Sequence, residues 1–226
     1  MAGTANTRKE FIAGFTPAHI KLLRSLNTPA KIQNYLDTLP TNHEPHGDTC
    51  KSPLHVLRTG NAHCIEAAML AAVILQLHSK KPLLLDLTAD KSDQDHVLAV
   101  YKEGAYWGAI AKSNHHALGY RDPVYRSVRE LVMSYAHEYL NLAGKKTLRS
   151  YAGPLDLRTF GQEWITRDGN VWEIPEALVR LPHKKLFTPS QARKLRSADA
   201  FQRTMSNVKR DKPETIRDVP FTRSER

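Results

Sequence analysis

The chain has 226 residues, of which 41% are hydrophobic and 25% are charged, and this composition is that of an ordinary globular protein rather than a disordered or collagen-like one. Its longest uninterrupted apolar run, Ala67 to Leu75, is too short to cross a bilayer, which takes about 20 residues as a helix. The first residues also lack the apolar core of a secretion signal. The sequence therefore predicts a cytoplasmic protein with no membrane partner.

The net charge of +10 is concentrated near the C-terminus. From Arg180 onward there are 13 Lys and Arg residues against 5 Asp and Glu, which leaves a net charge of +2 for the preceding residues. A weak electrostatic contact with nucleic acid is therefore expected of the tail and not of the rest of the chain. Stacking platforms for bases are sparse there, since Phe187 and Phe201 are the nearby aromatic residues.

The first part of the chain is predicted to be helical. Apolar residues recur at helical spacing in three segments: 11–26, 28–39 and 53–58. In the second of these, Thr28 and Pro29 are an N-cap followed by a first-turn proline, and Pro40 ends the helix. The polar stretch 41–48 is expected to be a loop.

The next helix is apolar on nearly all sides. Asn61 is its expected N-cap, and the helix should begin at Ala62 or His63 and continue to about His78. Because a helix without a polar face is buried, this segment is predicted to lie at the centre of the core.

Strands are expected to follow this helix. The predicted strands are 82–88, 95–101 and 106–111, with 102–105 joining the last two as a hairpin. The remaining predictions are an amphipathic helix over 126–141, turns and short strands over 147–188, and a helix over 190–208. Helices and strands do not alternate regularly, which favours an α+β protein over a doubly wound one.

Cys64 is the expected nucleophile because it opens the apolar helix. A helix N-terminus presents positive partial charge and free amide groups, which lower the pKa of a cysteine and favour the thiolate. The same amides can stabilise the oxyanion that forms when a carbonyl is attacked. The alternative is that Cys64 is a buried thiol that packs as a small hydrophobic residue.

His96 is the expected proton acceptor for Cys64, because it opens the second predicted strand and an imidazole can take up and return a proton. If Tyr101 pairs with Tyr106 in the hairpin, then His96 lies opposite Ala111. A group that orients the imidazole should lie at or just after that position.

Asn114 is assigned this orienting role, with Ser113 beside it as a further candidate. An asparagine can accept a hydrogen bond from an imidazole. Asp95 and Asp122 are the remaining alternatives for the third group.

Two segments, GNAHCIEAAMLAAVILQLHSKKPLLLDL and DHVLAVYKEGAYWGAIAKSN, resemble the core of the transglutaminase-like superfamily, whose fold is related to papain. The family pattern is a cysteine that opens an apolar helix, followed by a strand, a histidine strand, a turn and an aspartate strand. The resemblance covers roughly residues 50 to 125. It implies that Cys64 is the nucleophile and His96 the base, while the usual aspartate position falls at Ala111.

The expected fold is therefore α+β and transglutaminase-like or papain-like, with the cysteine-bearing helix buried against an antiparallel sheet and surrounded by helices. The main domain is placed at 28–189, between an N-terminal helical segment at 1–27 and a basic tail at 190–226. The expected function is that of a cysteine hydrolase or acyl transferase acting on an amide bond of a peptide or protein. The alternative, suggested by Ala111, is a catalytically silent module that binds a peptide or protein. No cofactor or metal is expected.

Three other features have simpler interpretations. Cys50 is expected to be structural, with a resolving thiol for Cys64 as the alternative. Glu66 is expected to interact with the helix dipole, although it could instead face the cleft. The spacing from His43 to His46 to Cys50 matches no strong zinc signature. Loop or surface positions are expected for most histidines, among them His43, His46, His63, His115 and His116.

Overall fold

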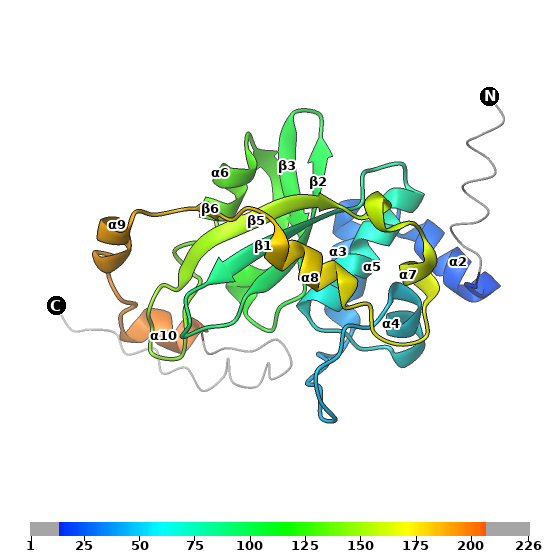
Figure 1. Cartoon of the computed structure of the whole chain (residues 1–226), viewed down its shortest axis with the longest axis horizontal. Coiled ribbons are helices and arrows are strands. Elements are labelled where there is room, and N and C mark those ends of the chain that lie inside the picture. The colour runs from blue at the N-terminus through cyan, green and yellow to red at the C-terminus, as the bar shows by residue number, and fades with distance from the viewer. Residues whose placement is uncertain (1–13, 207–226) are drawn as a thin grey trace.

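The computed structural model describes residues 14–206, which form an α+β protein built on a six-stranded antiparallel sheet. The strand order is β4-β3-β2-β1-β5-β6 (Figure 1). The strands are β1 (Leu83–Ala89), β2 (His96–Glu103), β3 (Tyr106–Ile110), β4 (Arg121–Tyr125), β5 (Leu148–Asp156) and β6 (Lys184–Lys185). The α+β prediction is confirmed at this level.

The helices that precede β1 gather at one end of the molecule in Figure 1. The first four described are α2 (Pro17–Ser25), α3 (Pro29–Thr38), α4 (Pro53–Thr59) and α5 (Cys64–Leu77). In α2, α3 and α4 a Ser or Thr side chain accepts a hydrogen bond from a first-turn amide and a proline follows it, so the sequence itself sets these starts. The predicted N-terminal helix is shorter than expected, since Thr16 caps it; residues 11–13 lie outside the described residues.

Helix α5 is the centre of the core, as its apolar sequence predicts. Every residue from Ile65 to Leu75 is buried, and the helix packs chiefly on β2. Its start differs from the prediction. His63 is the N-cap, and the side chain of Asn61 instead accepts a hydrogen bond from Lys51.

The sheet is covered on both faces. On β2, Val97, Ala99 and Tyr101 belong to the core cluster that contains α5, whereas Leu98 and Val100 belong to a second cluster. This alternation follows from the two-residue period of a strand. The second cluster contains residues that follow β4, including Leu131, Tyr135 and Tyr139.

The hairpin formed by β2 and β3 has a different register from the prediction. Tyr101 pairs with Gly108, not with Tyr106, because both strands extend to a tight turn at Gly104 and Ala105. Gly104 has a φ of 59°, a left-handed conformation that favours glycine. The observed register of the hairpin is therefore shifted by two residues from the predicted register.

The predicted helix over 126–141 is wrong in length. Helix α6 (Val128–Met133) ends after six residues, and turns follow it. Tyr135 donates to the carbonyl of Gly119 at 2.9 Å, and Tyr139 donates to the carbonyl of Gln94 at 2.7 Å. These tertiary hydrogen bonds hold the segment against the sheet in place of a longer helix.

Residues 157–180 contain more helix than the sequence predicts, whereas the single helix predicted over 190–208 is interrupted at 194–199 within the described residues. The helices after β5 are the 3₁₀ helix η2 (Leu157–Phe160), α7 (Glu163–Thr166), α8 (Glu173–Arg180), α9 (Pro189–Arg193) and α10 (Ala200–Ser206), while the 3₁₀ helix η1 (His116–Leu118) lies between β3 and β4. Ile174 and Leu178 bury one face of α8 in the α5 cluster. Within residues 14–206, every helix is too short or too polar to span a membrane.

Candidate active site

Cys64 and His96 lie in the wall of one cavity of about 440 Å³. Ser113 and Asn114 line the same cavity, so the structure brings together all four residues assigned to the site from the sequence. The wall is formed by residues of segments 41–44, 62–64, 93–96, 112–115 and 138–140, with Leu118. Strand and helix ends therefore meet here from distant parts of the sequence.

Cys64 is the first residue of α5 and is partly exposed. Burial alone would raise the pKa of its thiol. Hydrogen bonds from the side chains of His63 and His96, the charge of His96 and the amide of Val97 outweigh burial and lower the pKa of Cys64 to about 5. The thiolate is therefore the favoured form at neutral pH, as a nucleophile requires.

His96 opens β2 and is 5% exposed. Its Nε2 atom lies 3.0 Å from the carbonyl oxygen of Leu118, at the end of η1. Because a carbonyl can only accept a hydrogen bond, Nε2 carries a proton, and the other ring nitrogen remains to interact with Cys64. A backbone carbonyl thus fixes the ring in the way that an orienting side chain would.

The position that lies opposite His96 in the hairpin differs from the predicted one. Ala99 pairs with Ile110, and continuing that register places residue 113, not Ala111, opposite residue 96. The backbone of Ala111 is held by Gln33 of α3, whose side chain accepts from its amide at 2.9 Å and donates to its carbonyl at 2.8 Å. The Ser113 hydroxyl accepts a hydrogen bond from the amide of His115 at 3.0 Å.

The two aspartates considered as alternatives lie in different places. Asp95 lines the cavity, and its carboxylate accepts a hydrogen bond from the amide of Ala89 at 2.8 Å. Asp122 lies at an exposed position of β4. The contact that the structure shows for the His96 ring is with Leu118, which sequence reasoning did not consider.

His63 is the functional candidate that sequence reasoning missed. The sequence places it in a loop or on the surface, but it lines the cavity next to Cys64 and lowers the pKa of that thiol. Its Nε2 atom lies 2.9 Å from the carbonyl oxygen of Thr49 and 3.4 Å from carboxylate oxygens of Glu44 and Glu66. The sequence contains a local indication of its position at a helix start, because His63 and Glu66 are spaced as the two residues of a capping box.

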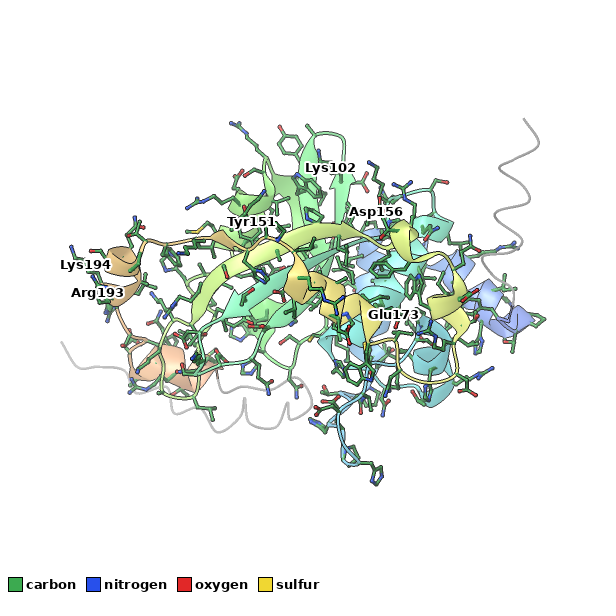
Figure 2. The ribbon with its side chains drawn as sticks, viewed as in Figure 1. Lys102, Tyr151, Asp156, Glu173, Arg193 and Lys194 are labelled. Carbon is green, nitrogen blue, oxygen red and sulfur yellow. The ribbon has the colours of Figure 1, made fainter. Side chains whose placement is uncertain are left out.

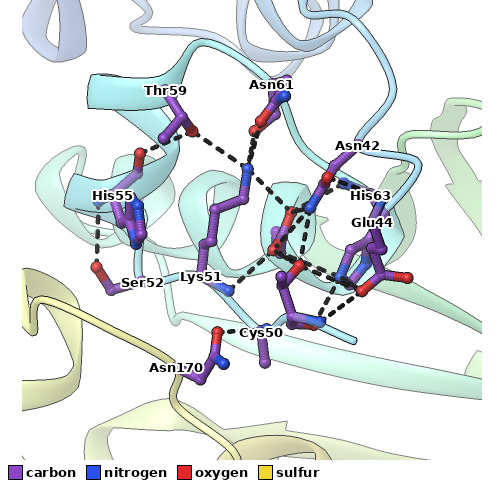
Figure 3. A network of polar contacts seen from close by, with 12 residues as sticks. Asn42, Glu44, Cys50, Lys51, Ser52, His55, Thr59, Asn61, His63 and Asn170 are labelled. Atoms are coloured by element: carbon purple, nitrogen blue, oxygen red, sulfur yellow. Dashed lines mark hydrogen bonds and ion pairs between the residues drawn. The ribbon is translucent and has the colours of Figure 1, made fainter. Parts of the chain in front are cut away.

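A buried network of polar contacts supports this part of the wall (Figure 3). Glu66 is fully buried and accepts hydrogen bonds from the amide of His63 at 3.1 Å, the amide of Lys51 at 2.9 Å and the hydroxyl of Thr49 at 2.9 Å. Asn42 donates to the same carboxylate at 3.2 Å. Glu66 is therefore both a first-turn acidic residue and an inward polar group, which joins the loop 41–51 to the start of α5.

Lys51 and Cys50 form the far side of this network. The ammonium group of Lys51 lies 3.6 Å from Glu66 and donates to the carbonyl of Asn61 at 2.8 Å. Cys50 is fully buried, and burial, followed by the charge of Glu66, raises the pKa of its thiol to about 12. Cys50 is thus a protonated, packed thiol, which fits the structural role expected of it.

Within residues 14–206, no group of three or more His, Cys, Asp or Glu side chains is arranged to hold a metal ion.

A scan against protein-family models finds no match, and a search among curated proteins finds no relative either.

Proposed function

We propose that this protein is a cysteine hydrolase or acyl transferase of transglutaminase-like type, which acts on an amide bond of a peptide or protein through Cys64 and His96. The observation that carries the proposal is the position of Cys64. It opens a buried helix, faces a cavity and is stabilised as a thiolate by imidazole groups. Each of these features is what nucleophilic catalysis requires of a cysteine.

In the first step the Cys64 thiolate attacks the carbonyl carbon, a carbon–sulfur bond forms, and the carbonyl electron pair moves to oxygen. The amides of Cys64 and Ile65 lie in the first turn of α5, before the amide of Ala67 that donates to the carbonyl of His63, so helix geometry leaves them without a carbonyl partner in the helix. They are available to stabilise the oxyanion. When the carbon–nitrogen bond breaks, the protonated ring of His96 gives its proton to the leaving amine.

In the second step His96 acts as the base. Its neutral ring takes a proton from water, or from an acceptor amine, which then attacks the thioester and releases Cys64 as a thiolate. The cavity wall has polar and charged residues on several sides, among them Asp93, Asp95, Lys112 and Glu138. Water can therefore enter, and hydrolysis is the simpler outcome.

The proposal is tested with 4-nitrophenyl acetate, a small ester whose release of nitrophenolate reports acylation and whose acyl-enzyme is detected by mass spectrometry. We expect a burst of nitrophenolate and an acetyl group on Cys64. We expect neither with Cys64→Ser, and no change with Cys50→Ser. The His96→Gln variant should still be acylated, since nitrophenolate leaves without a proton, but its acetyl group should persist because the base is missing.

Iodoacetamide labelling provides the matching pH test. Because the pKa of Cys64 is lowered, its thiolate fraction stays high as the pH falls and declines only through about 5. Cys64 should therefore react at about pH 6 much faster than Cys50. Slow and equal labelling of the two thiols, together with no acylation, would instead support the silent binding module.

A further inference from the structure

We propose that His63 is a second histidine of the active centre, whose imidazolium pairs with the Cys64 thiolate and keeps its proton while His96 carries protons to and from the reacting groups. This rests on the function proposed above. The inference comes from the different surroundings of the two histidines, which line the same cavity wall as Cys64 and both favour its thiolate.

The Nε2 atom of His63 faces negatively charged groups. Nε2 lies 2.9 Å from the carbonyl oxygen of Thr49, which fixes a proton on it. The same atom lies 3.4 Å from Oε1 of Glu44 and 3.4 Å from Oε1 of Glu66. Two carboxylates on one side and a thiolate on the other favour a ring that carries both of its protons.

The Nε2 atom of His96 faces a neutral group instead. Its Nε2 atom contacts the carbonyl oxygen of Leu118 at 3.0 Å. A carbonyl orients the ring without adding the full charge of a carboxylate. His96 is therefore better suited to lose and regain a proton in each cycle, whereas His63 is better suited to hold one.

The charged groups around His63 come from several elements that pack against it. Glu44 comes from the loop before α4, Glu66 and Cys64 from α5, and His96 from β2; Lys51 lies behind Glu66. Burial alone would lower the pKa of His63. Its hydrogen bond with Cys64 and the charge of Glu66 reverse this and raise the pKa of His63 to about 9.

During turnover the charges remain balanced. Formation of the thioester removes the thiolate charge, and the imidazolium of His63 stays next to Glu44 and Glu66. Release of the acyl group returns the thiolate to a site that is already positive. His63 thus makes Cys64 a better leaving group in the second step as well as a better nucleophile in the first.

The test compares His63→Gln with His96→Gln. Glutamine can still donate to the carbonyl of Thr49 but cannot carry a charge. The pKa of Cys64 is read from the ultraviolet absorbance of the thiolate, with Cys64→Ser as the blank. Cys50 does not interfere, because burial keeps its pKa at about 12.

We expect His63→Gln to raise the pKa of Cys64 by about 1 to 3 units, the usual effect of losing a nearby opposite charge. The acetylated variant should still lose its acetyl group, because His96 is intact, but more slowly than wild type, because Cys64 becomes a poorer leaving group; His96→Gln should retain the group. His137→Ala, which removes an exposed histidine outside the cavity wall, should match wild type in both measurements.

A second measurement is independent of whether His63→Gln folds. The ring signals of His63 in the NMR spectrum should titrate at about 9 in wild type, and at lower pH in Cys64→Ser, which lacks the thiolate. A His63 ring that is neutral at pH 7, or a Cys64 pKa unchanged by His63→Gln, would overturn the proposal. A wild-type Cys64 with an ordinary thiol pKa would overturn the proposed function itself.

Discussion

Glu66 is a carboxylate with no exposed surface, and the residues that follow it in α5 are apolar as far as Leu75. Burying a charge is costly unless hydrogen bonds and a counter-charge replace water. Here Lys51 supplies the counter-charge, and donors from the loop 41–51 and from His63 supply the hydrogen bonds. One side chain thereby ties the cavity wall to the start of α5.

We expect Glu66→Ala to lower the free energy of unfolding by about 3 to 5 kcal/mol, because it leaves the ammonium group of Lys51 buried without its partner. Urea unfolding monitored by tryptophan fluorescence measures this. The control is Glu176→Ala, which removes the partner of Arg180 from an exposed ion pair on α8 and should change stability by less than about 1 kcal/mol. Equal effects of the two substitutions would show that the Glu66 network contributes little.

At the scale of elements, the hairpin of β2 and β3 is held in register by a close approach of side chain to backbone. The ring of Tyr101 lies over Gly108, where a Cβ atom would meet the ring at 2.6 Å and the carbonyl oxygen of Arg121 at 2.9 Å. The Tyr101 hydroxyl also hydrogen-bonds to that of Tyr120 at 2.7 Å. This register determines which residues after β3 reach the cavity.

We expect Gly108→Ala to cost about 1 to 3 kcal/mol, as overpacking of a tight site does, because the backbone oxygen of Arg121 cannot move aside as a flexible side chain would. Thermal unfolding measures the loss. Gly119→Ala is the matched control, since the nearest atom to its added Cβ would be at 3.5 Å, an ordinary contact. A Gly108→Ala protein as stable as the control would show that the ring of Tyr101 has room to move.

At the scale of the whole molecule, the C-terminal segment contacts the edge of the cavity. Ala198 is buried, and its amide donates to the carbonyl of Gly144 at 2.8 Å. The carbonyl of Ser206, at the end of α10, lies 3.1 Å from Nδ1 of His115, a residue of the cavity wall. Arg193 and Lys194 lie at the end of the molecule away from Glu173 (Figure 2).

We expect truncation after Pro189 to remove binding to a single-stranded oligonucleotide, because it deletes 10 Lys and Arg residues against 5 Asp and Glu. Binding by the full chain should weaken steeply as salt is added. Fluorescence anisotropy at low and high salt measures both effects. An affinity that survives truncation would place any contact elsewhere on the protein.

The same truncated protein tests how far the fold depends on this segment. No residue of 190–206 belongs to either core cluster, so we expect the melting temperature to fall by about 2 to 4 °C, the shift that corresponds to ~1 kcal/mol in a chain of this size. Loss of the unfolding transition would show instead that α10 is part of the folded unit.

Local patterns were enough to predict much of this protein. The apolar run after Cys64 requires a buried helix, and the strands β1, β2 and β3 follow from their composition and the glycine between the last two. The cap at Thr28 acts within one helical turn, so its effect can be derived without knowing the fold. The placement of Cys64 and His96 at element starts is a local property of the same kind.

Tertiary contacts decided the rest, because they join residues that are distant in sequence. The carbonyl of Leu118 reaches His96 across 22 residues, and no side-chain pattern marks a backbone acceptor. The residues after Met133 form hydrogen bonds to the loops that precede β4 and β2 instead of continuing a helix. The charge around His63 likewise depends on a loop folding back onto α5. Local sequence specifies a buried helix that opens with a cysteine, whereas long-range contacts specify which groups surround that cysteine, because hydrogen bonding and charge act through space rather than along the chain.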